Sequence, residues 1–201
     1  AGSTVVVDNS VYDYSQPLVM LPDETTLAGD PTNVVPAEVP AESLSAFDQA
    51  RQSFYSGDYS AALEQTNSAL QDNPNDAVIH EFRALTLFAS GQYQESAATL
   101  YAVLSVGPGW DWTTMIGLYP DVATYTEQLR QLEGYVGENP SDTAGLLVLS
   151  YHYITAGHDD AAASQLKRLV KLTPEDPLAT QLLLDVDPDA TLPQEPQEVL
   201  P

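Results

Sequence analysis

Apolar residues recur at helical spacing over most of the chain, in paired stretches that meet at a glycine. Gly57, Gly91 and Gly157 each separate two stretches in which apolar residues return every three or four positions. Such spacing predicts amphipathic helices with one apolar face each. The glycine supplies the tight turn between the two helices, where a Cβ would be strained. The pattern therefore predicts an all-α fold built of helix pairs.

The predicted pairs repeat at a nearly fixed interval, which is marked by prolines. Pro74, Pro108, Pro140 and Pro174 follow one another with gaps of 34, 32 and 34 residues. Proline cannot continue a helix, so each one ends a pair. A period in this range is typical of stacked supersecondary units. We expect an array over residues 44–185, with units near 44–75, 77–109, 110–141 and 143–176, a capping helix over 177–185, and extended tails over 1–43 and 186–201.

The first two units can be placed in register residue by residue. Gly57 and Gly91 are 34 positions apart, as are Tyr59 and Tyr93, and Ala62 is small where two helices must cross closely. In this register the chain resembles the tetratricopeptide repeat, an antiparallel pair of helices of 34 residues. The resemblance covers roughly residues 44–176 and implies an α-solenoid of about four helix pairs. The chain also resembles exported bacterial members of that family.

The third unit departs from the pattern. Residues 110–119 predict a short first helix that Pro120 interrupts, and residues 121–139 predict a second helix. One interpretation is a locally altered core in which Trp110 and Trp112 pack. The other is a kink that shapes a binding surface. We favour the altered core.

The family resemblance implies that side chains of the first helices line a concave groove. In this chain the groove would be apolar and aromatic and would suit an extended apolar peptide. It lacks the lysines and asparagines with which some family members hold acidic peptide ends. The alternative is that about half of these side chains fill the core between helices. The groove residues implied by the repeat register are Phe47, Arg51, Phe54, Tyr55, Val78, Phe82, Leu85, Phe88, Leu147, Val148, Tyr151 and Ile154.

The N-terminal tail begins with an apolar, β-prone segment before an acidic linker broken by prolines. Such a segment left in water is an aggregation hazard, so we expect it to dock on a protein surface. The residues of this predicted docking segment are Val5, Val7, Val11, Tyr12, Tyr14, Leu18, Val19 and Leu21.

Two hypotheses for the function follow. In the first, the N-terminal segment of one copy enters the groove of the next, and this head-to-tail contact builds a filament of a structural protein. In the second, the chain is a monomeric adaptor whose groove binds an extended peptide of another protein. We favour self-assembly, because one mechanism then accounts for both the apolar tail and the apolar groove.

Composition excludes several other classes of function. With 29 acidic and six basic residues, the net charge is −23, which disfavours nucleic-acid binding because phosphate contacts need clustered lysine and arginine. The absence of cysteine excludes disulfides and thiolate chemistry. His80, His152 and His158 belong to no metal-binding motif. We therefore expect no enzymatic activity, no cofactor and no metal site.

Two further expectations concern the surroundings of the protein. The sequence starts at Ala1 without methionine, either because a signal peptide has been removed or because the chain was trimmed, and we favour the first. We expect an extracellular or cell-surface protein, with the periplasm as the alternative. Solubility accounts for the acidic balance; weak Ca²⁺ crosslinking between acidic faces is the alternative, although no calcium-loop spacing is present.

Overall fold

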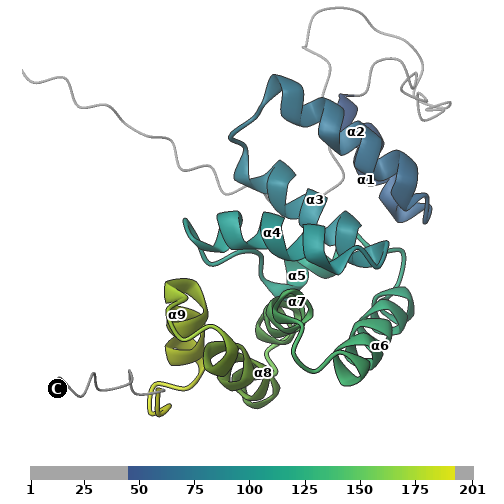
Figure 1. Ribbon diagram of the computed structural model, residues 1–201. Coiled ribbons are helices and arrows are strands. Elements are labelled where there is room, and N and C mark those ends of the chain that lie inside the picture. The colour runs from purple at the N-terminus through teal and green to yellow at the C-terminus, as the bar shows by residue number, and fades with distance from the viewer. Residues whose placement is uncertain (1–44, 193–201) are drawn as a thin grey trace, which may run out of the picture. The chain divides into compact units, whose positions relative to one another are not determined.

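The computed structural model describes residues 45–192, which contain nine α-helices and no strand (Figure 1). The predicted all-α class is confirmed. The helices are α1 Ala46–Tyr55, α2 Tyr59–Asp72, α3 Ala77–Ala89, α4 Tyr93–Leu104, α5 Trp112–Ile116, α6 Val122–Glu138, α7 Thr143–Thr155, α8 Asp159–Leu172 and α9 Pro177–Val186.

Most of the helices start at a side-chain cap. A short polar side chain just before the helix accepts a hydrogen bond from a backbone N–H of the first turn, which would otherwise lack a partner. Aspartate provides this cap for six helices, so part of the acidic composition has a local structural cause. The capping residues are Ser45, Asp58, Asp76, Asp111, Asp121, Asp142 and Asp176.

The turns within the pairs depend on glycine. Gly57, Gly91 and Gly157 have φ of 83°, 72° and 73°, in the left-handed region that other residues rarely adopt. The N–H of Gly57 bonds to the carbonyl of Phe54, which closes the end of α1. The glycine-centred turns that the sequence predicts are therefore present in all three places.

Three pairs of consecutive helices pack face to face, namely α1 with α2, α3 with α4, and α7 with α8. Successive units stack through α2 on α3 and α8 on α9. Small buried residues allow the close approach within pairs, since Ala50, Ala62, Ala84 and Ala162 are fully buried. After α9, Ala190 still packs against the core, and Lys167 Nζ lies 2.7 Å from Asp187 Oδ2.

The third unit does not continue the stack in line. α5 is only five residues long, and α4 packs directly against α7 instead of against a full third-unit helix. Gln94 Nε2 donates to Asp142 Oδ2 at 3.0 Å and joins the starts of these two helices. α6 lies beside α7 and also touches α3 (Figure 1). The second and fourth units thus meet directly, with the third unit placed beside them.

Candidate functional site

Aromatic side chains of α1, α3 and α7 form one continuous buried surface. The rings of Phe47 and Phe54 on α1 contact Phe82 on α3, with centroid distances of 5.3 and 5.4 Å. Further along α3, Phe88 lies 3.8 Å from the ring of His152 on α7. We call the surface made by Phe47, Phe54, Phe82, Phe88, Tyr151 and His152 the first-helix face.

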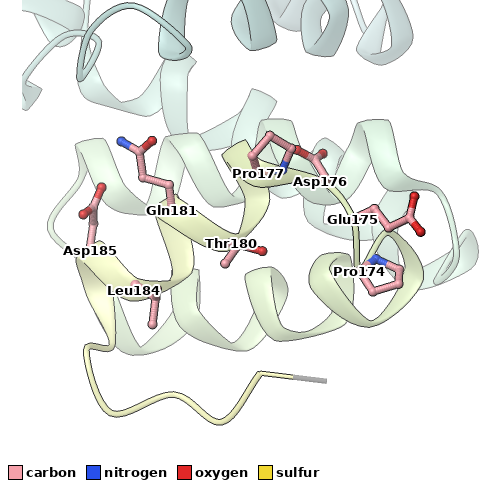
Figure 2. Close-up of a pocket in the computed structure, with 8 residues that line it drawn as sticks. All are labelled: Pro174, Glu175, Asp176, Pro177, Thr180, Gln181, Leu184 and Asp185. Atoms are coloured by element: carbon pink, nitrogen blue, oxygen red, sulfur yellow. The ribbon is translucent and has the colours of Figure 1, made fainter. Parts of the chain in front are cut away.

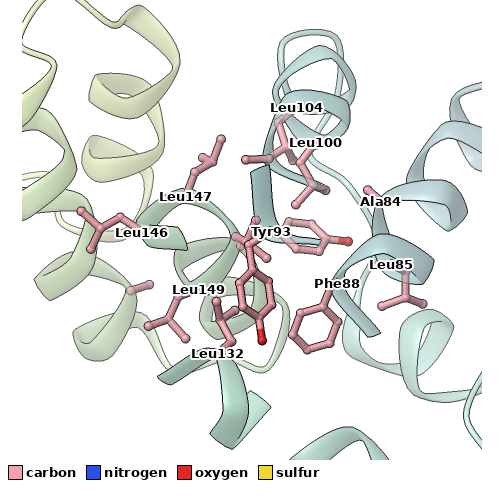
Figure 3. Close-up of a cluster of buried hydrophobic side chains, with 14 of the residues drawn as sticks. Ala84, Leu85, Phe88, Tyr93, Leu100, Leu104, Leu132, Leu146, Leu147 and Leu149 are labelled. Atoms are coloured by element: carbon pink, nitrogen blue, oxygen red, sulfur yellow. The ribbon is translucent and has the colours of Figure 1, made fainter. Parts of the chain in front are cut away.

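Residues 110–138, the covering segment, lie on this face. The ring of Tyr119 packs edge-on against Phe54 at 5.0 Å. Tyr125 contacts both Phe88, at 6.4 Å, and His152, at 5.7 Å. Farther along α6, Leu132 belongs to the same buried cluster as Phe88 (Figure 3). The chain itself therefore supplies the aromatic partners of its own first helices.

The polar groups of the covering segment are also paired. Tyr119 Oη donates to Gln128 Oε1 at 2.8 Å, and Gln128 Nε2 donates to Tyr59 Oη at 2.7 Å. Gln128 is buried, and a buried amide without partners would be costly. This chain of bonds ties α6 to the start of α2, on the first unit.

A buried carboxylate holds the start of the covering segment. Glu81 on α3 is 5% exposed, and its Oε1 accepts from the backbone N–H of Trp110 at 2.5 Å and from Tyr151 Oη at 2.6 Å. Burial raises the pKa of Glu81 from its ordinary value, and the two hydrogen bonds partly oppose that shift. Burial, together with the Glu81 charge, raises the pKa of Tyr151.

The backbone reaches Glu81 through a glycine that has no space for a side chain. Gly109 has φ of +76°, and a Cβ there would lie 2.9 Å from both Glu81 Oε1 and Tyr151 Cε2. Leu104 closes the third side at 3.1 Å. The chain therefore passes tightly between α3, α4 and α7 at this point.

His152 is a neutral core residue. Its side chain is fully enclosed, and this desolvation lowers its pKa from 6.5 to about 3. Tyr125 Oη lies 3.4 Å from its Nδ1. A strongly shifted pKa marks a catalytic group when it lies in a cleft, but here the ring is stacked on Phe88 and packed among aromatic side chains.

The structure places most of the predicted groove residues inside the protein. Phe54, Phe82, Leu85, Phe88, Leu147, Val148 and Tyr151 are buried, while Phe47, Arg51, Val78 and Ile154 are half-buried and Tyr55 is 55% exposed. A buried side chain offers no area to a ligand while its neighbours stay in place, so these seven residues act in helix packing. Peptide binding at the rest stays a prediction.

The predicted docking segment of the tail lies outside the described residues. This applies to Val5, Val7, Val11, Tyr12, Tyr14, Leu18, Val19 and Leu21.

Sequence reasoning missed the polar residues that hold the covering segment. Glu81 had a readable signal, because it lies four and seven positions before Leu85 and Phe88 and so shares their helix face. An acid on the apolar face of a helix needs a buried partner. Tyr59, Tyr119 and Gln128 gave no such signal, since their pairing depends on where the third unit folds.

A shallow hollow outside this region lies on the outer side of α9 (Figure 2). Leu184, which is 37% exposed, is an apolar residue of its lining. Its lining carries acids but no histidine, lysine or arginine, so it offers no pair of a base and an electrophilic group for catalysis. The lining residues are Pro174, Glu175, Asp176, Pro177, Thr180, Gln181, Leu184 and Asp185.

No three histidine, aspartate or glutamate side chains of residues 45–192 are placed to share a metal ion. No helix of this range combines the length and the apolar character that a membrane crossing requires.

Comparison with known proteins identifies the repeat. The family model described as tetratricopeptide repeat matches residues 44–109, which hold α1 to α4. No curated protein matches the chain. The helix pair α7–α8 and the capping helix α9 continue the layout of the matched units. Residues 44–109 therefore belong to the tetratricopeptide repeat family, and the described part of the chain has an all-α, solenoid-type fold.

Proposed function

We propose that this protein is a non-enzymatic adaptor that holds another protein on the surface of its helix array. Tetratricopeptide repeats are a protein-interaction module and are generally non-catalytic. The two buried acid–base groups support this proposal, since Glu81 and His152 both act in packing between helices. Catalysis would need such groups to meet in an open cleft.

The position of the covering segment favours an adaptor over a self-assembling filament. The covering segment already lies on the first-helix face of units one, two and four, through Tyr119 on Phe54 and Tyr125 on Phe88. The N-terminal segment of another copy would therefore find no bare aromatic groove at these residues. This favours the adaptor over head-to-tail assembly through the groove.

The charge of the chain favours one class of partner. A net charge of −23 gives the protein a negative field, which attracts basic protein surfaces and repels nucleic acids and acidic membranes. The exposed large apolar side chains of residues 45–192 supply separate contact points on the array. They are Tyr55, Tyr101, Val106, Val122, Leu172, Leu184 and Leu192.

Light scattering on the purified full chain tests the proposal. We expect a monomer over a wide concentration series, both for the full chain and for a version without residues 1–22. Polymers that grow with concentration and disappear when residues 1–22 are deleted would overturn the adaptor and support the filament. A partner protein isolated on the chain should then bind it at a fixed stoichiometry by calorimetry, and should not bind the heat-unfolded chain.

A further inference from the structure

We infer that residues 110–138 are a permanent internal ligand of the first-helix face, which closes this face to peptides from other proteins. The inference rests on the packing of this segment alone, so it holds whether or not the chain acts as an adaptor.

The first support is the depth to which the segment is buried. Met115 and Leu132 are fully buried, and Tyr119, Tyr125 and Val136 are between 2% and 4% exposed. These five side chains are spread from α5 to the end of α6, so the whole length of the segment is anchored. Releasing it would expose all of them together with the aromatic rings they cover, a cost comparable with the total stability of a domain.

The second support is that the segment is held by polar contacts at separate points. Trp110 N–H bonds to Glu81 at its start, and Gln128 bonds to Tyr59 in its middle. Near its end, Tyr135 Oη donates to Asp142, the residue that caps α7. A peptide from another protein would have to replace each of these bonds, because a buried polar group left without a partner is destabilising.

The third support is the path of the chain into the segment. Gly109 passes between Glu81, Tyr151 and Leu104 with no space for a Cβ. The connection into the segment is therefore enclosed by side chains of α3, α4 and α7 and is part of the packing between units two and four. A segment that opens as a lid would need a flexible connection to the rest of the chain, whereas the connection at Gly109 is packed in the core.

Hydrogen exchange on the intact protein tests the inference. Amides of α6 should exchange as slowly as those of α3 and α7, within about tenfold, because all three should be exposed only by the same cooperative opening. If α6 exchanges more than about tenfold faster while α3 and α7 keep their protection, the segment opens by itself and the inference is wrong.

Two substitutions within the segment sharpen this test. Tyr125→Ala removes a ring that contacts both α3 and α7, so exchange should accelerate in α3, α6 and α7 together. Val122→Ala is the matched control on the same helix, since Val122 is 54% exposed, and it should leave exchange unchanged. Acceleration confined to α6 in the Tyr125 variant would overturn the inference. If that variant does not fold, the measurement on the unmodified chain still decides.

A peptide probe gives an independent readout. A labelled synthetic peptide of residues 110–138 should show no saturable binding to the intact chain at concentrations up to about 100 μM. Saturable binding that the unlabelled peptide competes away, and that a scrambled peptide does not reproduce, would show an open face and contradict the inference.

Discussion

Tyr151 donates a 2.6 Å hydrogen bond to the carboxylate of Glu81, a residue 70 positions earlier in the chain. The bond joins α7 to α3, and so the fourth unit to the second. The same carboxylate oxygen also accepts the backbone N–H of Trp110. One buried acid thus connects two repeats with the segment that covers them.

Removing this acid should destabilise the protein strongly. In Glu81→Ala the Tyr151 hydroxyl and the Trp110 N–H both lose their acceptor inside the core, and we expect a loss of about 2–5 kcal/mol in the free energy of unfolding. Urea denaturation followed by circular dichroism measures this loss. Glu81→Gln keeps a carbonyl oxygen at the same place and is the control. Equal losses in the two variants would show that the acceptor is not what matters.

The titration of Glu81 should be visible in the free energy of unfolding, because the difference in this free energy between the unmodified chain and Glu81→Gln should change with pH. The unfolded chain releases this proton near the ordinary pKa of 4.5, whereas burial raises the pKa in the folded state. The folded state therefore holds the proton more tightly, and its stability relative to Glu81→Gln should fall as the pH rises from about 4.5 through the raised pKa. The slope is at most about 1.4 kcal/mol per pH unit. Urea midpoints of both proteins at several pH values measure this slope. If the stability of the unmodified chain relative to Glu81→Gln rises with pH, the pKa of Glu81 is not raised in the folded state.

His152 should give a dependence of opposite sign. Burial lowers its folded-state pKa to about 3, while the unfolded chain takes up the proton near 6.5. Acidification from about pH 6.5 towards 3 therefore favours the unfolded state, by at most about 1.4 kcal/mol per pH unit. His152→Phe keeps an aromatic ring on Phe88 and should remove this part of the acid sensitivity in urea titrations. Tyr125→Phe, which removes only the hydroxyl near Nδ1, should keep it. Unchanged acid sensitivity in His152→Phe would show that His152 takes up its proton as readily in the folded protein as in the unfolded chain.

Gly109 and Gly91 provide a matched pair of glycine substitutions. Both have positive φ, +76° and +72°, but an added Cβ meets three close atoms at Gly109 and nothing within 4 Å at Gly91. Gly91→Ala should cost only the backbone strain, about 1–2 kcal/mol. Gly109→Ala should cost a further 1–3 kcal/mol or so because the core is overfilled. Thermal or urea unfolding compares the two variants, and equal costs would mean that the passage at Gly109 has room for a Cβ.

The turns and helix ends that depend on single residues could be predicted from the sequence. Gly57, Gly91 and Gly157 end helices because only glycine adopts their backbone conformation without strain, and this requirement is visible in a single chain. The repeat register also predicted that Phe54, Phe82 and Phe88 lie on one face of the first helices, and Phe54 of α1 does pack on Phe82 of α3.

The sequence did not reveal that this face is covered. Repeat spacing assumes that each unit stacks on the one before it, and the third unit breaks that rule when α4 packs on α7. Contacts such as Tyr119 with Phe54 and Tyr151 with Glu81 join residues far apart in the chain. No local pattern specifies such contacts, so they follow only from the folded structure.

Nuclear Overhauser spectroscopy on the full chain with labelled phenylalanine, tyrosine and histidine rings tests whether residues 110–138 lie on the first helices. We expect cross-peaks between the rings of Phe54 and Tyr119, whose centroids are 5.0 Å apart, and between the rings of His152 and Tyr125, whose centroids are 5.7 Å apart. Tyr55, which is exposed beside Phe54, should show no cross-peak to Tyr119 or Tyr125. A folded protein that lacks the predicted cross-peaks would show that residues 110–138 do not lie on the first helices.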